Sequence, residues 1–130
     1  MNKSIGAQLR AIHKKGSDKF LKIAKETYFD IGNDVIIATP IDEGLALANW
    51  NMAYDRIDPT LQSIGRDSSS ELTVFLNDFK IDDKTFYLTN SLPYAYRLEN
   101  GWSKKAANGM VKVSTARFNT LAQQKINKYK

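Results

Sequence analysis

Side chains suited to a buried face recur at steps of three and four along the first third of the chain, which is the period of an α-helix. They are Phe20, Ala24, Thr27, Ile31 and Val35. Ser17 or Asp18 can cap the start of this helix. Pro40 limits its end, because proline disfavours helical geometry in the preceding residue. The pattern predicts a long amino-terminal helix, in which Gly32 marks a bend or a close contact.

A two-residue period follows and predicts a strand with one buried face. In it, Ala48, Trp50, Met52 and Tyr54 alternate with Asn49, Asn51, Ala53 and Asp55. Residues 57–70 hold turn signals at Asp58-Pro59 and Gly65, so we expect a loop there. Residues 85–89 are rich in β-forming types and predict a second strand.

Three further helices are predicted in the second half of the chain. Ser68 and Glu71 have capping-box spacing, and the helix they begin buries Leu72, Phe75, Leu76 and Phe79. Residues 93–100 predict a short helix ended by Gly101. From Val111 to the end, one long amphipathic helix is expected, with its apolar face formed by Thr115, Phe118, Leu121, Ala122 and Ile126.

This order of elements predicts an α+β fold in a single domain spanning residues 1–130, with a long amino-terminal helix, a small antiparallel sheet, a short middle helix and a carboxy-terminal helix. Only two strands are clear in the pattern. A two-stranded sheet is marginal by itself. Either a strand is missing from the pattern, or a neighbouring copy completes the sheet by edge pairing.

Composition is ordinary for a soluble globular domain, with 42% apolar and 25% charged residues among 130. No apolar run approaches the roughly 20 residues of a membrane span, so we expect no membrane association. The first 15 residues lack the apolar core of a signal peptide. Cysteine is absent, which excludes disulfides and thiolate metal sites and suits a reducing cytoplasm.

Charge is distributed unevenly along the chain. Residues 1–25 carry seven Lys and Arg against one Asp, residues 102–130 carry seven and no acid, and the middle carries five against thirteen acids. One interpretation is that these are solvated helix faces. The other is electrostatic complementarity between neighbouring copies, or toward an acidic partner or DNA.

The sequence offers little for catalysis or for metal binding. Its single histidine, His13, lies in a Lys-rich stretch and is interpreted as a surface residue. Asp82-Asp83 lacks the ligand spacing of a calcium loop, and Asp42-Glu43 is interpreted as a turn rather than an acid–base pair. Single glycines form no phosphate-binding loop. We therefore expect no enzyme, no metal and no cofactor.

A basic DNA-associated protein of a phage or mobile element is the alternative function. Lys15, Lys19 and Lys22 share one helix face and could contact phosphates. No base-reading module accompanies them.

Two segments are dense in residues with special backbone geometry. Residues 39–50 read TPIDEGLALANW, and Pro40, Asp42 and Gly44 predict a rigid corner between the long helix and the first strand. Residues 88–111 read LTNSLPYAYRLENGWSKKAANGMV and lead a strand through a Pro-marked turn and a Tyr-rich segment into a glycine-ended loop.

In this order, the two segments resemble the siphophage neck and tail-completion family that includes minor tail protein Z. That family's pattern has Thr-Pro-x-Asp-x-Gly, then Leu-Pro-Tyr-Ala, Leu-Glu-x-Gly and Gly-Met-Val. The strict matches cover about a quarter of the chain. Glu43, Leu45 and Leu47 depart from the usual Thr and Arg residues, and Ala107-Asn108 replaces the usual Pro-x.

The resemblance implies a structural virion protein of the phage neck, made in the bacterial host cytoplasm. Such a protein completes the tail and joins head to tail as part of a homo-oligomeric, six-membered ring around channel DNA. The implied partners are the head-completion or connector protein and the tail terminator protein. The candidate interface or structural residues are Pro40, Asp42, Gly44, Trp50, Pro93, Tyr94, Tyr96, Arg97, Glu99, Gly101, Trp102, Gly109 and Met110.

Overall fold

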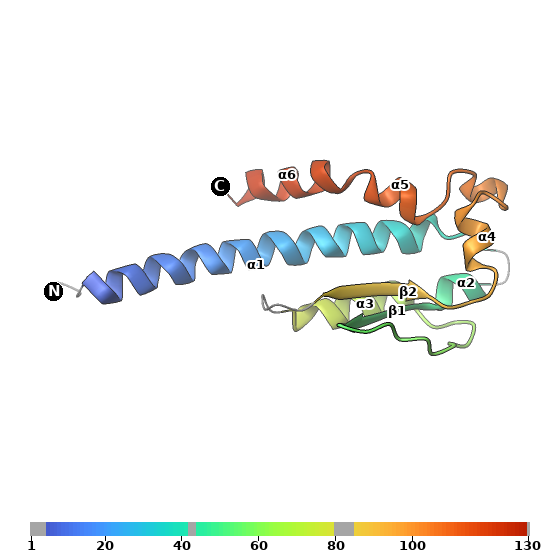
Figure 1. Ribbon diagram of the computed structural model, residues 1–130, viewed down its shortest axis with the longest axis horizontal. Coiled ribbons are helices and arrows are strands. Elements are labelled where there is room, and N and C mark those ends of the chain that lie inside the picture. Colours follow the sequence, from blue (N-terminus) through green and yellow to red (C-terminus); the bar gives the residue numbers. More distant parts are fainter. Residues whose placement is uncertain (1–4, 42–43, 80–84, 130) are drawn as a thin grey trace.

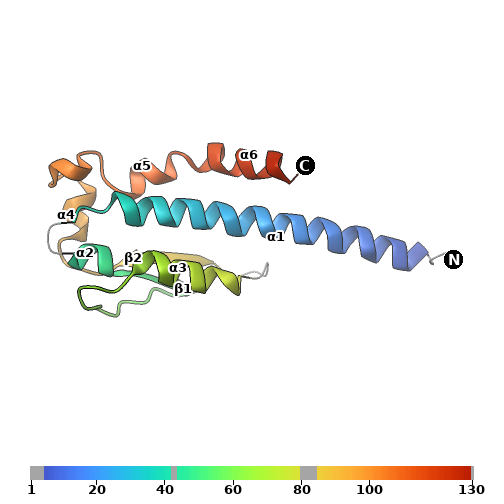
Figure 2. The same ribbon diagram turned by 180° about the vertical axis from the view of Figure 1, so that it is seen from behind.

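The computed structural model describes residues 5–41, 44–79 and 85–129, and it confirms the predicted α+β architecture. Its elements in chain order are α1 (Ile5–Ala38), α2 (Leu45–Ala48), β1 (Trp50–Tyr54), α3 (Ser68–Asn77), β2 (Phe86–Asn90), α4 (Ala95–Glu99), the 3-10 turn η1 (Lys104–Ala106), α5 (Val111–Thr115) and α6 (Phe118–Lys128). Helix α1 runs through the middle, with α3 and the sheet on one side and α5 and α6 on the other (Figures 1 and 2).

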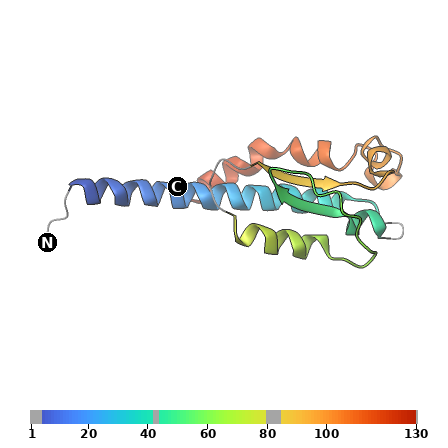
Figure 3. The ribbon, with the colours of Figure 1, turned by 60° about the horizontal axis from the view of Figure 1, so that its bottom comes forward.

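Helix α1 is longer than predicted. It begins at Ile5, so the expectation that Ser17 or Asp18 caps its start is wrong. Most residues before Ser17 are good helix formers and none is proline, so nothing in the sequence interrupts the helix there. Its amino-terminal part extends beyond the rest of the molecule (Figure 3). The predicted limit at Pro40 is confirmed, because α1 ends at Ala38.

The two strands pair antiparallel, in a register that runs from Trp50 opposite Asn90 to Tyr54 opposite Phe86. Helix α3 connects them along the chain. One face of the sheet packs on α3, where the ring centroids of Tyr54 and Phe75 are 4.7 Å apart. Among the described residues the sheet has these two strands and no third. Ala48, predicted to start the first strand, belongs instead to α2.

The core lies where α1, α3 and the sheet meet. Its buried residues are Val35, Ile36, Trp50, Leu72, Leu76, Ala106 and Met110. Gly32 lets α3 approach α1, because a Cβ built on it lies 2.8 Å from Cδ2 of Leu72. The predicted close contact at Gly32 is therefore confirmed.

The opposite face of β1 is also buried, which the alternating pattern did not predict. Asn51 donates to the backbone oxygens of Asp58 (3.1 Å) and Thr60 (2.6 Å), and its side-chain oxygen accepts from Nε2 of Gln62 (3.1 Å). Asn49 donates to the backbone oxygen of Gln62 (3.0 Å) and accepts from its N–H (2.7 Å). These two amides fasten the loop that follows β1 against the strand edge.

We expect Asn51→Ala to lower the free energy of unfolding by about 2–3 kcal/mol, because it removes three hydrogen bonds made by a side chain that is 1% exposed. Urea denaturation measures the loss, and limited chymotrypsin digestion at Leu61 reports release of the loop. Asn119→Ala, at an exposed position on α6, is the control. Equal stability of both variants would contradict this role for Asn51.

Two local predictions need correction. The cap of α3 is Asp67 rather than Ser68, since the Asp67 carboxylate accepts from the Ser70 N–H at 3.1 Å, while the Ser68 hydroxyl is buried and donates to the Leu47 oxygen. The single carboxy-terminal helix is in fact two, α5 and α6. Of its predicted apolar face, Leu121 is buried and Ala122 is half-buried, whereas Thr115, Phe118 and Ile126 are exposed.

Candidate assembly interface

The two segments singled out in the sequence, residues 39–50 and 88–111, meet at one end of the molecule, where α2 and α4 lie (Figure 1). Asn90 Nδ2 donates to the Ala46 oxygen at 2.9 Å, and Lys105 Nζ donates to the Ile41 oxygen at 2.9 Å. Trp50 from the first segment and Met110 from the second belong to the same core cluster. We call these two segments together the motif corner.

Glu99 holds the second half of the motif corner in place. Its carboxylate accepts from three successive backbone N–H groups at the start of α5: Met110 at 2.7 Å, Val111 at 3.0 Å and Lys112 at 3.3 Å. The first N–H groups of a helix have no partner within the helix and favour a negative charge. Glu99 therefore caps α5 from a distant turn of the chain.

Two glycines make this arrangement sterically feasible. Gly101 has φ +84°, and a Cβ built on it lies 2.5 Å from the backbone oxygen of Ala107. Gly109 has φ +88°, and a Cβ built on it lies 2.5 Å from the backbone oxygen of Glu99. The predicted positive φ at Gly101 is thus confirmed. The Leu-Glu-x-Gly and Gly-Met-Val motifs form one interlocked structure in which each requires the other.

The first half of the motif corner is tied to the end of α1. Trp50 Nε1 donates to the Thr39 hydroxyl at 2.8 Å, and that hydroxyl donates to the Val35 oxygen at 2.8 Å. Pro40 is buried, and Gly44 takes a positive φ of +86°. Asp42, and with it the Asp42-Glu43 turn, lies outside the described residues.

The candidate residues divide into core and surface. Trp50 and Met110 are 3% and 1% exposed, so they are core residues and cannot contact a partner directly. Tyr96 and Trp102 are 78% and 71% exposed, and the Arg97 guanidinium lies 4.7 Å from the Trp102 ring centroid. Pro93 and Tyr94 are also exposed, beside the start of α4. We call Tyr94, Tyr96, Arg97 and Trp102 the aromatic cluster.

A second exposed apolar surface lies at the same end of the molecule. Ile37, Ile41 and Ile64 are each more than half exposed and line a groove of about 540 Å³, with Leu47 among its other lining residues. Grouped exposed apolar side chains mark protein-interaction surfaces more often than isolated ones do. The motif corner therefore presents large apolar and aromatic side chains on the surface of a rigidly held structure.

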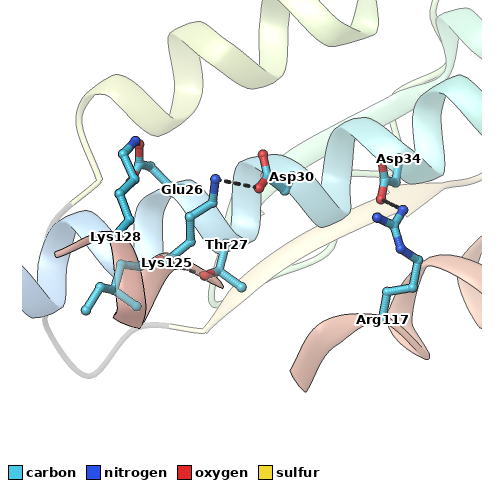
Figure 4. Close-up of polar contacts among 8 residues, drawn as sticks. Glu26, Thr27, Asp30, Asp34, Arg117, Lys125 and Lys128 are labelled. Carbon is cyan, nitrogen blue, oxygen red and sulfur yellow. Dashed lines mark hydrogen bonds and ion pairs between the residues drawn. The ribbon is translucent and has the colours of Figure 1, made fainter. Parts of the chain in front are cut away.

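Opposite charges join α1 to α6, as the close-up in Figure 4 shows. Lys128 pairs with Glu26 at 2.9 Å, Lys125 with Asp30 at 2.9 Å, and Arg117 with Asp34 at 2.6 Å. We call these three pairs the charge ladder. The positive charge near the carboxy terminus thus pairs with acids of the same chain. Neither solvated helix faces nor complementarity toward another molecule, the two interpretations of the sequence, included such pairing.

The ladder affects the ionisation of its members. Burial raises the pKa of Glu26, but hydrogen bonds with Tyr129 and Lys128, together with the charges of Lys128 and Lys125, outweigh burial and hold that pKa below its ordinary value of 4.5. The hydrogen bond to Glu26 raises the pKa of Lys128 above 10.5. A carboxyl group whose pKa is lower in the folded state stabilises the fold at pH values above its pKa in the unfolded chain. This stabilisation is lost as the pH falls through the folded-state pKa. A lysine whose pKa is higher in the folded state stabilises the fold at pH values below its pKa in the unfolded chain. This stabilisation is lost as the pH rises through the folded-state pKa.

We therefore expect Glu26→Gln to unfold at a lower temperature than the wild type at pH 7, and the difference to vanish as the pH falls well below 4.5. Thermal unfolding followed by circular dichroism across a pH series measures this. Asp18→Asn, on the exposed part of α1, is the control and should unfold like the wild type at every pH. A difference for Glu26→Gln that persists in acid would rule out the ion pair as its source.

Other candidate chemistry finds no site in the described part of the chain. No group of three or more His, Asp or Glu side chains gathers there in a way that could hold a metal ion. The His13 side chain and the Asp82-Asp83 pair lie outside what the structure describes. None of the helices within residues 5–41, 44–79 and 85–129 has both the length and the apolar content to cross a membrane.

Sequence reasoning missed the charge ladder, although a signal was present. Glu26, Asp30 and Asp34 recur at every fourth position and so share one helix face. Totals of charge over regions of the chain conceal this pattern, because the four-residue period appears only along one helix face. Comparison of the chain with protein-family models, with curated proteins and with solved structures found no match in any of the three.

Proposed function

We propose that this protein is a structural subunit of the neck of a long-tailed phage, which completes the tail and joins it to the head as part of a ring around the DNA channel. The observation that carries the proposal is the motif corner. The two segments that resemble the neck family are joined there by the Asn90–Ala46 and Lys105–Ile41 hydrogen bonds. Within the second segment, Glu99, Gly101 and Gly109 interlock the motifs. The corner also displays the aromatic cluster on the surface.

The proposed mechanism is assembly through complementary surfaces. Aromatic side chains and arginine are favoured as anchors at the centres of protein interfaces. Trp102 and Tyr96 are exposed at one end of the molecule and are supported by a buried core, so docking requires little ordering of the backbone. A ring needs one face of a subunit to meet a different face of the next, and the groove beside Ile37 and Ile64 offers a second face at the same end.

An in vitro joining assay tests the proposal. Heads and tails from a mutant phage lacking this protein are mixed with purified wild-type protein, and infectious particles are counted. We expect joining to be restored, and the double variant Tyr96→Ala/Trp102→Ala to reduce it at least about tenfold, because interface anchors commonly contribute 2 kcal/mol or more. Leu61→Ala, an exposed apolar residue on the loop after β1, is the matched control.

Failure of the folded wild-type protein to join competent heads and tails would overturn the neck proposal. A basic DNA-associated protein is then the next candidate. It is tested by DNA binding across a salt series, since binding through phosphate contacts weakens steeply as salt rises.

A further inference from the structure

Helix α6 is attached to the molecule differently from the other long helices. The core cluster is formed by residues of α1, β1, α3 and the motif corner, and α6 supplies none of its described members. Leu121 is the only fully buried residue of α6, while Phe118 and Ile126 are both more than a third exposed. The core cluster therefore contains no residue of α6, which contributes one buried apolar side chain, Leu121, outside that cluster.

Charge complementarity provides most of the specific contacts of α6. Its side of the charge ladder is formed by Lys125 and Lys128 together with Arg117, which immediately precedes the helix. The α1 side is the acidic stripe Glu26, Asp30 and Asp34 (Figure 4). Exposed ion pairs contribute little to stability individually, and salt screens them. An attachment of this kind is specific in its pattern but easily opened.

A short break separates α5 from α6 at the base of α6. Helix α5 ends at Thr115 and α6 begins at Phe118, and the intervening Ala116 and Arg117 are exposed. Helix α5 itself is held by Glu99 and by the buried Met110 at its start. Hinges are commonly a few residues at the ends of such elements. Opening at this point would release α6 and leave the motif corner intact.

We propose that α6 is an exchangeable arm, which in the assembled protein lies on the acidic stripe of a second copy of this chain. Every copy carries both the arm and an identical stripe, so exchange replaces each contact within a chain by the same contact between chains. The inference rests on the proposed function in one respect, namely that the copies lie next to one another in a ring. It names the contact that would link neighbouring subunits.

Complementary charge reversal tests the exchange with purified full-length protein. One variant, Glu26→Lys/Asp30→Lys, has a basic stripe and a basic arm. The other, Lys125→Glu/Lys128→Glu, has an acidic stripe and an acidic arm. In each variant two of the three ladder pairs become like-charge pairs within the chain, while Arg117–Asp34 is unchanged, and each arm matches the stripe of the other variant. Circular dichroism first establishes that both variants fold, as expected from a core that excludes α6.

The expected result is a 1:1 complex when the two variants are mixed, detected by light scattering after size exclusion, while each variant alone stays unassociated. The complex should dissociate at high salt. A mixture of the basic-stripe variant with wild-type protein is the control. It should form much less complex, because the wild-type arm already has a docking site in its own chain.

Cross-linking then locates the contact. Because the chain contains no cysteine, Asp30→Cys and Lys125→Cys each introduce a single thiol. The two variants are mixed, opened in high salt, concentrated as salt is removed and treated with a short bis-maleimide. A cross-link between chains supports exchange, and Ser63→Cys in place of Asp30→Cys should give none. No complex in the charge-reversal mixture, with both variants folded, would overturn the proposal. Neither readout depends on head–tail joining, so each proposal can fail separately.

Discussion

Gly109→Ala should lower the free energy of unfolding by about 3 kcal/mol or more, a large effect for the addition of one methyl group. Gly109 is buried with φ +88°, a conformation that costs L-residues about 1–2 kcal/mol. The added Cβ would also overlap Oε1 of Glu99 and lie 2.5 Å from the Glu99 backbone oxygen. Making room for it displaces the carboxylate that caps α5.

Gly65→Ala separates the two contributions. Gly65 has φ +98°, but no atom lies within 4 Å of a Cβ built on it, so this variant carries the backbone strain without the clash. Urea denaturation of both variants should show a loss for Gly109→Ala that exceeds the loss for Gly65→Ala by about 2 kcal/mol. In a Glu99→Ala background the excess should shrink, because the two positions are coupled. Equal losses would mean that Glu99 moves aside without cost.

Leu72→Ala is expected to lower the free energy of unfolding by about 2–5 kcal/mol. Its side chain is fully buried at the centre of the core cluster, between α1 and the sheet. Truncation removes apolar contact area and leaves a cavity that the surrounding helices fill only in part. Thermal and urea unfolding measure the loss. Val74→Ala, at an exposed position on the same helix, should change stability by less than about 0.5 kcal/mol.

The close approach of Gly32 to Leu72 gives this prediction a second readout. Alone, Gly32→Ala brings a methyl group within 2.8 Å of Leu72 Cδ2, so the fully buried Leu72 side chain must shift to make room for it. In the Leu72→Ala background, the added methyl group occupies the cavity left by the truncation. The higher helix propensity of alanine then raises stability by up to about 1 kcal/mol. We expect its effect to change sign between the two backgrounds. A destabilising Gly32→Ala in both would show that another neighbour limits this position.

The α+β fold was predictable because four elements carry strong periodic patterns. Leu72, Phe75 and Leu76 define α3 almost without other information, and they are buried or half-buried as expected. Boundaries were harder, because they depend on competition between neighbouring caps: Asp67 accepts from the Ser70 N–H, although Ser68 with Glu71 had the better motif. The α5–α6 break has no proline or glycine to announce it.

The candidate site was predictable in part. The positive φ at Gly44 and at Gly101 follows from local chemistry, so the turns could be anticipated. Tertiary contacts could not. Nothing local to Glu99 shows that its carboxylate binds backbone N–H groups eleven residues later, or that Asn51 serves a loop rather than solvent. Polar side chains that become buried by satisfying distant backbone groups have no periodic signal in the sequence.

The charge ladder has a consequence for synthesis of the protein. Lys128 meets Glu26 across 102 positions and Arg117 meets Asp34 across 83 positions, so these contacts can form only after the segment that holds Arg117 and α6 has been synthesised. The core cluster ends earlier, at Met110. Domains fold as their residues emerge during translation. A message truncated after α5 keeps every described member of the core cluster, so it should still yield a product with a folded core.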